Sequence, residues 1–141
     1  MFKDKLTNIH VSDVQVMLTP RELKQEFPVS GTLLESVARS RETIADIIHG
    51  RDHRLLVVCG PCSIHDPAAA LEYGKKLKDL ADRVSDQLFV IMRAYFEKPR
   101  TTVGWKGLIN DPNLDGTFRI QEGLRVARGL LVDLLEMGLP L

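Results

Sequence analysis

The sequence has no long apolar run, few cysteines and no net charge. Its apolar segments fall well short of the roughly 18 residues that a membrane-spanning helix needs, and the initial segment MFKDKLTNIH lacks the apolar core of a signal peptide. Basic and acidic residues number 19 each, so the charge expected of a general nucleic-acid or membrane-surface binder is missing. We therefore expect a cytoplasmic protein that binds neither nucleic acid nor membrane.

The only two cysteines, Cys59 and Cys62, form the sequence CGPC. Two are too few for the disulfide framework of a secreted domain. CGPC also matches the thioredoxin active site, but there a helix starts at the motif and stabilises a thiolate. Here the helix start signal, Asp66-Pro67, comes several residues later. We expect Cys59 to be a core residue of an apolar run and Cys62 to be the available thiol, with a redox protein as an alternative.

The apolar pattern predicts helices and strands that alternate. Two continuous apolar runs, at 54–59 and 88–94, are typical of parallel strands covered on both faces. Apolar residues at steps of three and four predict helices, with proline near their starts and glycine near their ends. The expected helices run from Pro20 to about Phe27, and over about 31–49, 67–84 and 117–137.

This order of elements is typical of βα units, which build a parallel sheet in the α/β class. Two parallel strands alone leave both sheet edges open and offer helices little surface to pack against. The sequence stops where a third strand would begin. We therefore expect a piece of a larger domain, with a complete small domain as the alternative.

Polar segments follow both predicted strands, GPCSIHD at 60–66 and a longer segment at 93–106. Parallel α/β proteins bind ligands at this edge of the sheet. The longer segment holds four cations and one acid, an excess of three positive charges. Arginine and lysine beside threonine hydroxyls suit phosphate or carboxylate groups, so we expect a small phosphorylated ligand. The residues concerned are Arg93, Lys98, Arg100 and Lys106, with Thr101 and Thr102.

The remaining residues of these segments give weaker signals. Cys62 can bind a divalent metal, with His65 or Asp66 as local partners, but the spacing alone does not define a site. Three aromatic residues are expected to pack beneath the longer segment and not to stack on bases. They are Tyr95, Phe96 and Trp105.

Two motifs, GPCSIHDP at 60–67 and EKPRTTVGWKGLINDP at 97–112, resemble class I 3-deoxy-D-arabino-heptulosonate 7-phosphate (DAHP) synthase, in the bacterial branch regulated by aromatic amino acids. The resemblance covers essentially the whole chain. It implies a (β/α)8 TIM barrel, with 1–53 as an N-terminal regulatory and oligomerisation extension and 54–141 as the first two βα units of an incomplete barrel. Ala94 and Asn113 depart from the valine and histidine expected, away from the implied chemistry.

The resemblance also implies an activity. Family members condense phosphoenolpyruvate with erythrose 4-phosphate to DAHP and phosphate, the first step of the shikimate pathway, with a divalent metal such as manganese or iron. By motif position, Cys62 would bind the metal, Arg93 would bind phosphoenolpyruvate, and Lys98 would lie between the two substrates as the catalytic residue. Erythrose 4-phosphate would be held by the Pro99 backbone, Arg100 and Thr101.

The resemblance further implies what this chain lacks. The other metal ligands, a His, a Glu and an Asp, come from later strands in the family, so the 141-residue chain alone is expected to be inactive. An aromatic amino acid inhibitor is implied, most like that of the tyrosine-sensitive form, with phenylalanine and tryptophan as alternatives, and so is a homo-oligomer, dimer or tetramer. Synthases of eight-carbon sugar phosphates, or a non-catalytic assembly or effector-binding module, are the other readings.

Overall fold

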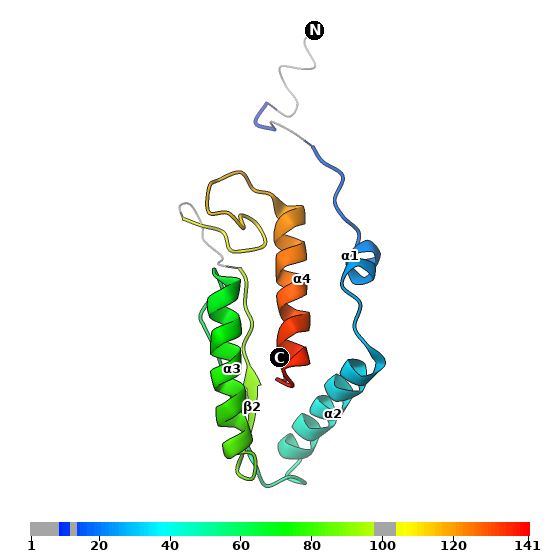
Figure 1. Cartoon of the computed structure of the whole chain (residues 1–141), viewed down its shortest axis with the longest axis vertical. Coiled ribbons are helices and arrows are strands. Elements are labelled where there is room, and N and C mark those ends of the chain that lie inside the picture. The colour runs from blue at the N-terminus through cyan, green and yellow to red at the C-terminus, as the bar shows by residue number, and fades with distance from the viewer. Residues whose placement is uncertain (1–8, 12–13, 98–103) are drawn as a thin grey trace.

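The computed structural model describes residues 9–11, 14–97 and 104–141. Within these ranges helices and strands alternate as predicted, which confirms the α/β class (Figure 1). None of the helices in these ranges is long and apolar enough to cross a membrane. In chain order the elements are α1 (Pro20–Glu26), α2 (Gly31–Ile48), β1 (Leu55–Cys59), α3 (Pro67–Arg83), β2 (Leu88–Met92) and α4 (Ile120–Glu136).

The strands β1 and β2 pair in parallel, as predicted, with a register that runs from Leu55 opposite Leu88 to Cys59 opposite Met92. The prediction that both strands are covered on both faces is wrong for β1. Its Leu55 and Val58 side chains are 65% and 60% exposed, because no described element packs over them. The carboxyl ends of the two strands lie side by side, as the parallel register requires.

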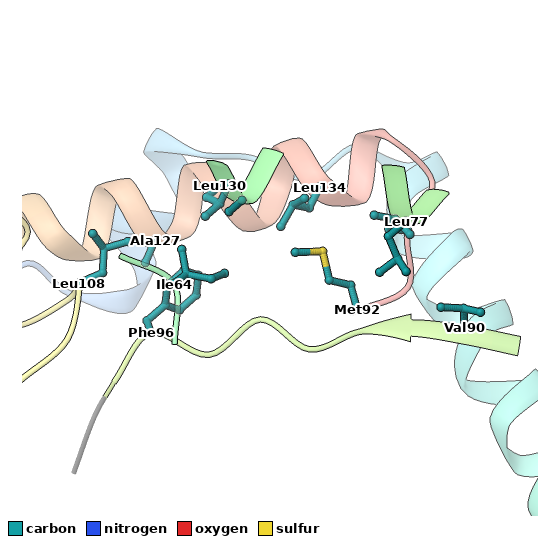
Figure 2. Packing of buried hydrophobic residues seen from close by; sticks show 11 residues of the cluster. Ile64, Leu77, Val90, Met92, Phe96, Leu108, Ala127, Leu130 and Leu134 are labelled. Atoms are coloured by element: carbon teal, nitrogen blue, oxygen red, sulfur yellow. The ribbon is translucent and has the colours of Figure 1, made fainter. Parts of the chain in front are cut away.

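The core lies where β2, α3 and α4 meet. Met92 and Leu134 are completely buried, and Leu77 of α3 is 6% exposed. Figure 2 shows these side chains pointing toward one another between β2 and the two helices. Each buried side chain of this size contributes roughly 1.5–3 kcal/mol of hydrophobic free energy, so this cluster sets the position of β2 beneath the helices.

The core continues past the strand ends into the segments that follow them. Ile64 is 2% exposed, Phe96 7% and Leu108 1%, and they pack with Ala127 and Leu130 of α4 (Figure 2). The polar segments therefore have apolar anchors in the core.

The start of α4 differs from the sequence prediction by three residues. We expected a helix from about Thr117, whereas α4 begins at Ile120. Phe118 has a φ of 52°, in the left-handed region that a right-handed helix excludes. Thr117 instead turns back on Asp115, whose carboxylate accepts hydrogen bonds from the Thr117 amide at 2.9 Å and its hydroxyl at 2.6 Å.

After α4 the chain returns to the sheet. The amide of Met92, at the end of β2, donates a hydrogen bond of 2.8 Å to the carbonyl of Pro140. Pro140 thus lies beside β2, where the next parallel strand of a βα repeat would run.

Candidate functional site

The candidate site lies where the parallel strands end. The Arg93 amide donates a 2.8 Å hydrogen bond to the Cys59 carbonyl, which continues the pairing one residue past the strands. Gly60 follows Cys59, and a Cβ at Gly60 would lie 2.3 Å from the Arg93 carbonyl oxygen. No side chain fits in that space, so glycine lets the two polar segments approach main chain to main chain.

The Arg93 side chain joins the two segments. Its Nη1 donates hydrogen bonds to the carbonyls of Pro61 at 2.7 Å and Cys62 at 2.8 Å. Its guanidinium carbon lies 4.9 Å from the centroid of the Tyr95 ring, within the range of a cation–π interaction. The side chain nevertheless remains solvent-exposed. A fixed, exposed arginine at a strand end can hold a phosphate or carboxylate.

Cys62 lies beside Arg93 as a free, exposed thiol. The structure thereby brings together two of the residues singled out from the sequence, because the Arg93 guanidinium binds the Cys62 main chain. Cys59, the other free cysteine, is only partly buried and borders the core. It contacts Tyr73 of α3, whose pKa is raised above its usual value by burial and by the neighbouring Cys59 thiol.

The exposed Cys62 thiol can donate to a divalent metal, and its two possible local partners, His65 and Asp66, are exposed as well. Asp66 is already engaged as the N-cap of α3, because its carboxylate accepts from the amides of Ala68 at 2.8 Å and Ala69 at 3.1 Å. Across the residues that the structure describes, no three His, Cys, Asp or Glu side chains gather into a possible metal site. The described residues therefore do not by themselves complete a metal site around Cys62.

The second polar segment forms a loop with a closed base. Glu97 and Gly107 form an antiparallel bridge, and the Leu108 amide donates 2.8 Å to the Phe96 carbonyl. Gly107 has a φ of 113°, and a Cβ there would lie 2.2 Å from the Phe96 carbonyl oxygen. Five candidate site residues fall between these anchors and lie outside the described residues: Lys98, Pro99, Arg100, Thr101 and Thr102.

Asp111 organises the far side of this loop and was missed in the sequence analysis. It is 6% exposed, and its Oδ2 accepts from the Gly116 amide at 3.2 Å. Its carbonyl accepts from the Trp105 indole Nε1 at 2.7 Å. Its Oδ1 is buried with no hydrogen-bond partner among the described residues. The Asp-Pro pair at 111–112 is the sequence signal of a turn that could have drawn attention to it.

The three aromatic residues of this segment differ in how deeply they are buried. Phe96 is buried and Trp105 packs against the core, as expected. The expectation is wrong for Tyr95, which is 38% exposed and faces Arg93. Side chains alternate along an extended chain, so a core position at Phe96 turns Tyr95 to the side that carries Arg93.

The fold and this edge define a class of protein: an α/β chain of parallel βα units with a candidate oxyanion site at the carboxyl ends of its strands. Comparison with known proteins makes the assignment specific. The DAHP synthetase I family matches the chain over residues 18–140, and the chain belongs to this family.

Individual relatives from this family match the chain over nearly all or all of its length. It is 61% identical to the protein named "Phospho-2-dehydro-3-deoxyheptonate aldolase, Tyr-sensitive" of Escherichia coli (strain K12) over 141 residues, which is 100% of this chain and 40% of that protein. It is 54% identical over 135 residues to the phospho-2-dehydro-3-deoxyheptonate aldolase of Amycolatopsis methanolica, covering 96% of this chain and 66% of that one.

A solved structure shares the fold. The phospho-2-dehydro-3-deoxyheptonate aldolase of Francisella tularensis SCHU S4 superposes with a TM-score of 0.87 at 54% sequence identity, over 92% of this chain and 38% of that chain. The chain thus spans well under half the length of the Escherichia coli and Francisella proteins.

Proposed function

We propose that this chain forms the N-terminal part of a DAHP synthase, which condenses phosphoenolpyruvate with erythrose 4-phosphate and releases phosphate. The observation that carries the proposal is the 61% identity across all 141 residues to a protein named for this activity. Residues 1–53 would be the extension and 54–141 the first two βα units of a TIM barrel. The hydrogen bond between the Met92 amide and the Pro140 carbonyl supports a sheet that continues on this side of β2, which a barrel requires.

In this proposal Arg93 holds an oxyanion of phosphoenolpyruvate. Two main-chain carbonyls fix its guanidinium before the ligand arrives, which reduces the ordering that binding requires. Lys98 would lie between the substrates and assist proton transfer, while the Pro99 backbone, Arg100 and Thr101 would hold erythrose 4-phosphate. The closed base formed by Glu97 and Gly107 supports this assignment, because it returns both ends of the 98–106 loop to the edge where Arg93 lies.

Cys62 would be one ligand of a divalent metal, with manganese and iron as the preferred candidates. When bound, the metal supplies a Lewis acid that polarises the aldehyde oxygen. A single thiolate and part of a phosphate-binding site do not make a complete catalytic centre. The chain alone should therefore be inactive.

The same family membership supports proposals about regulation and assembly. An aromatic amino acid would act as inhibitor and the complete protein would be a homo-oligomer. The identity is 61% to Tyr-sensitive relatives and 50% to Trp-sensitive and Phe-sensitive ones. This difference favours tyrosine as the inhibitor.

The test joins this chain to the part of the Escherichia coli Tyr-sensitive relative that follows the matched segment. We expect the fusion, supplied with Mn²⁺, to release phosphate only when both substrates are present, and the isolated chain to release none. Replacing Arg93 by Ala should lower kcat/KM roughly 10- to 100-fold, the effect of losing a hydrogen bond to a charged group. The matched control is Arg83→Ala, at the far end of α3, where the side chain donates to the Asp79 carbonyl of its own helix.

A folded fusion without activity would overturn the proposal and favour a non-catalytic assembly or effector-binding module. Turnover by the isolated chain would overturn the expectation that it needs later strands. A redox function makes a different prediction, a disulfide between Cys59 and Cys62. The position of the helix opposes it, because α3 begins only at Pro67, whereas a thioredoxin-type motif lies at the start of its helix.

A further inference from the structure

Tyr95 is held in place at both its main chain and its ring. Its carbonyl accepts a 2.7 Å hydrogen bond from the amide of Ile64, which is 2% exposed and anchored in the core. Its ring lies against the Arg93 guanidinium, 4.9 Å from the guanidinium carbon to the centroid. The two polar segments thus fix Tyr95, and Tyr95 in turn packs on the arginine.

The hydrogen bonds of Arg93 leave one edge of its guanidinium available. An arginine carries five N–H donors in a plane, two of them on Nη1. The carbonyls of Pro61 and Cys62 both accept from Nη1. Within the described residues no hydrogen bond reaches Nε or Nη2. The N–H groups of Nε and Nη2 point the same way along one edge and match two oxygens of a phosphate or carboxylate.

We propose that Tyr95 is a positioning residue for Arg93. The ring covers the guanidinium face while the two carbonyls hold Nη1, so the arginine is fixed with its Nε and Nη2 edge directed to an oxyanion. The attraction comes from the ring face, whose quadrupole favours a cation, and the tyrosine hydroxyl takes no part. This inference rests on the proposed function only in treating Arg93 as a substrate contact, and it deepens that function by naming the edge and its support.

The test observes the Arg93 Nε–H directly, in a proton–nitrogen NMR spectrum of the 141-residue chain. Inorganic phosphate, phosphoenolpyruvate and pyruvate are titrated separately, so that phosphate and carboxylate are distinguished. We expect the Nε–H signal to shift in a saturable way with at least phosphate or pyruvate, and the more effective of the two identifies the group that the edge holds. Side-on binding requires this shift, whereas binding at the Nη1 end would leave Nε unperturbed.

Two variants distinguish the contribution of the Tyr95 ring from that of its hydroxyl group. Tyr95→Leu should weaken anion binding about two- to fivefold, as expected for an exposed cation–π interaction. Tyr95→Phe should restore the wild-type affinity. The matched control is Tyr73→Leu, since the chain has two tyrosines and they are 39% and 38% exposed. It removes the same side chain without removing the Arg93 contact.

Three results would overturn the proposal: no Nε–H shift with any of the anions, wild-type affinity in Tyr95→Leu, or a Tyr95→Phe affinity as low as that of Tyr95→Leu. The wild-type titration shows whether the Nε and Nη2 edge of Arg93 binds the anion, even if a variant does not fold. A failure of the proposed function can be distinguished from a failure of this proposal. An inactive fusion protein together with an Nε–H shift leaves the positioning role intact, whereas an active fusion without the shift removes only that role.

Discussion

Replacing Gly123 by Ala tests how α4 is held against the loop. A Cβ at Gly123 would lie 2.1 Å from the Ile109 carbonyl oxygen and 2.7 Å from that of Leu108. Gly129, on the same helix, is the matched control, because a Cβ there would lie 3.2 Å from Cε1 of the Phe27 ring. Main-chain oxygens cannot rotate away, whereas a ring at a helix surface can shift by a few tenths of an ångström.

The two substitutions share one favourable effect and differ in one unfavourable effect. Alanine is preferred over glycine within a helix by about 1 kcal/mol. Overpacking against fixed atoms opposes this by roughly 3 kcal/mol, the upper end of its usual range. Gly123→Ala should therefore lower the free energy of unfolding by about 2 kcal/mol, whereas Gly129→Ala should raise it by between about 0 and 1 kcal/mol.

Urea unfolding followed by circular dichroism measures both changes. With a slope of about 2 kcal/mol per molar urea, Gly123→Ala should lower the midpoint by about 1 M, and Gly129→Ala should raise it by up to about 0.5 M. A Gly123→Ala midpoint equal to or above that of the wild type would refute the close approach of α4 to the loop. An equal fall in the urea midpoint of both variants would show that alanine destabilises α4 itself, and that the contact with Ile109 is not the cause.

Two further predictions concern charged pairs. Hydrogen bonds from Arg54 lower the pKa of Asp52 to about 2, so its contribution to stability should be present above the unfolded-state pKa near 4 and be lost as the pH falls toward 2. Carboxyl NMR titration should show this, and Asp52→Asn should flatten the acid limb of stability against pH. Arg125 donates to Glu26 at 2.6 and 2.9 Å. Glu26→Gln should speed amide hydrogen exchange in α1 with little change in overall stability, as expected for a surface ion pair, and unchanged exchange would contradict a role for this pair in docking α1.

The alternation of helices and strands could be predicted because it depends on local patterns. Apolar runs and proline or glycine signals gave all six described elements with their bounds correct to within a few residues. The start of α4 was the largest miss, since the left-handed conformation of Phe118 is not favoured by its residue type. The exposure of β1 was missed for a different reason: a strand's pattern shows what it is suited to pack against, not which elements are there to cover it.

The candidate site was predictable in its location but not in its contacts. A polar, cationic segment after a buried strand marks the ligand edge of a parallel sheet, and Arg93 and Cys62 do come together there. That Arg93 binds main-chain carbonyls, and that Tyr95 covers it, depends on the packing of Phe96 and Ile64 beneath. Asp111 was missed because its partners are main-chain groups and an indole, which leave no charge pattern in the sequence.

Main-chain contact explains why glycine recurs around this edge. Side chains at Gly60, Gly107 and Gly123 would each meet a carbonyl oxygen, those of Arg93, Phe96 and Ile109, at 2.3, 2.2 and 2.1 Å. The segments around the site thus meet backbone against backbone, as the hydrogen bonds from the Arg93 amide to the Cys59 carbonyl and from the Ile64 amide to the Tyr95 carbonyl also show. The Arg93 side chain adds to this backbone contact through Nη1, which donates to the Pro61 and Cys62 carbonyls. A side chain added at any of these glycines should therefore push the polar segments apart and disturb the site. Replacing one surface cation should leave the fold unchanged.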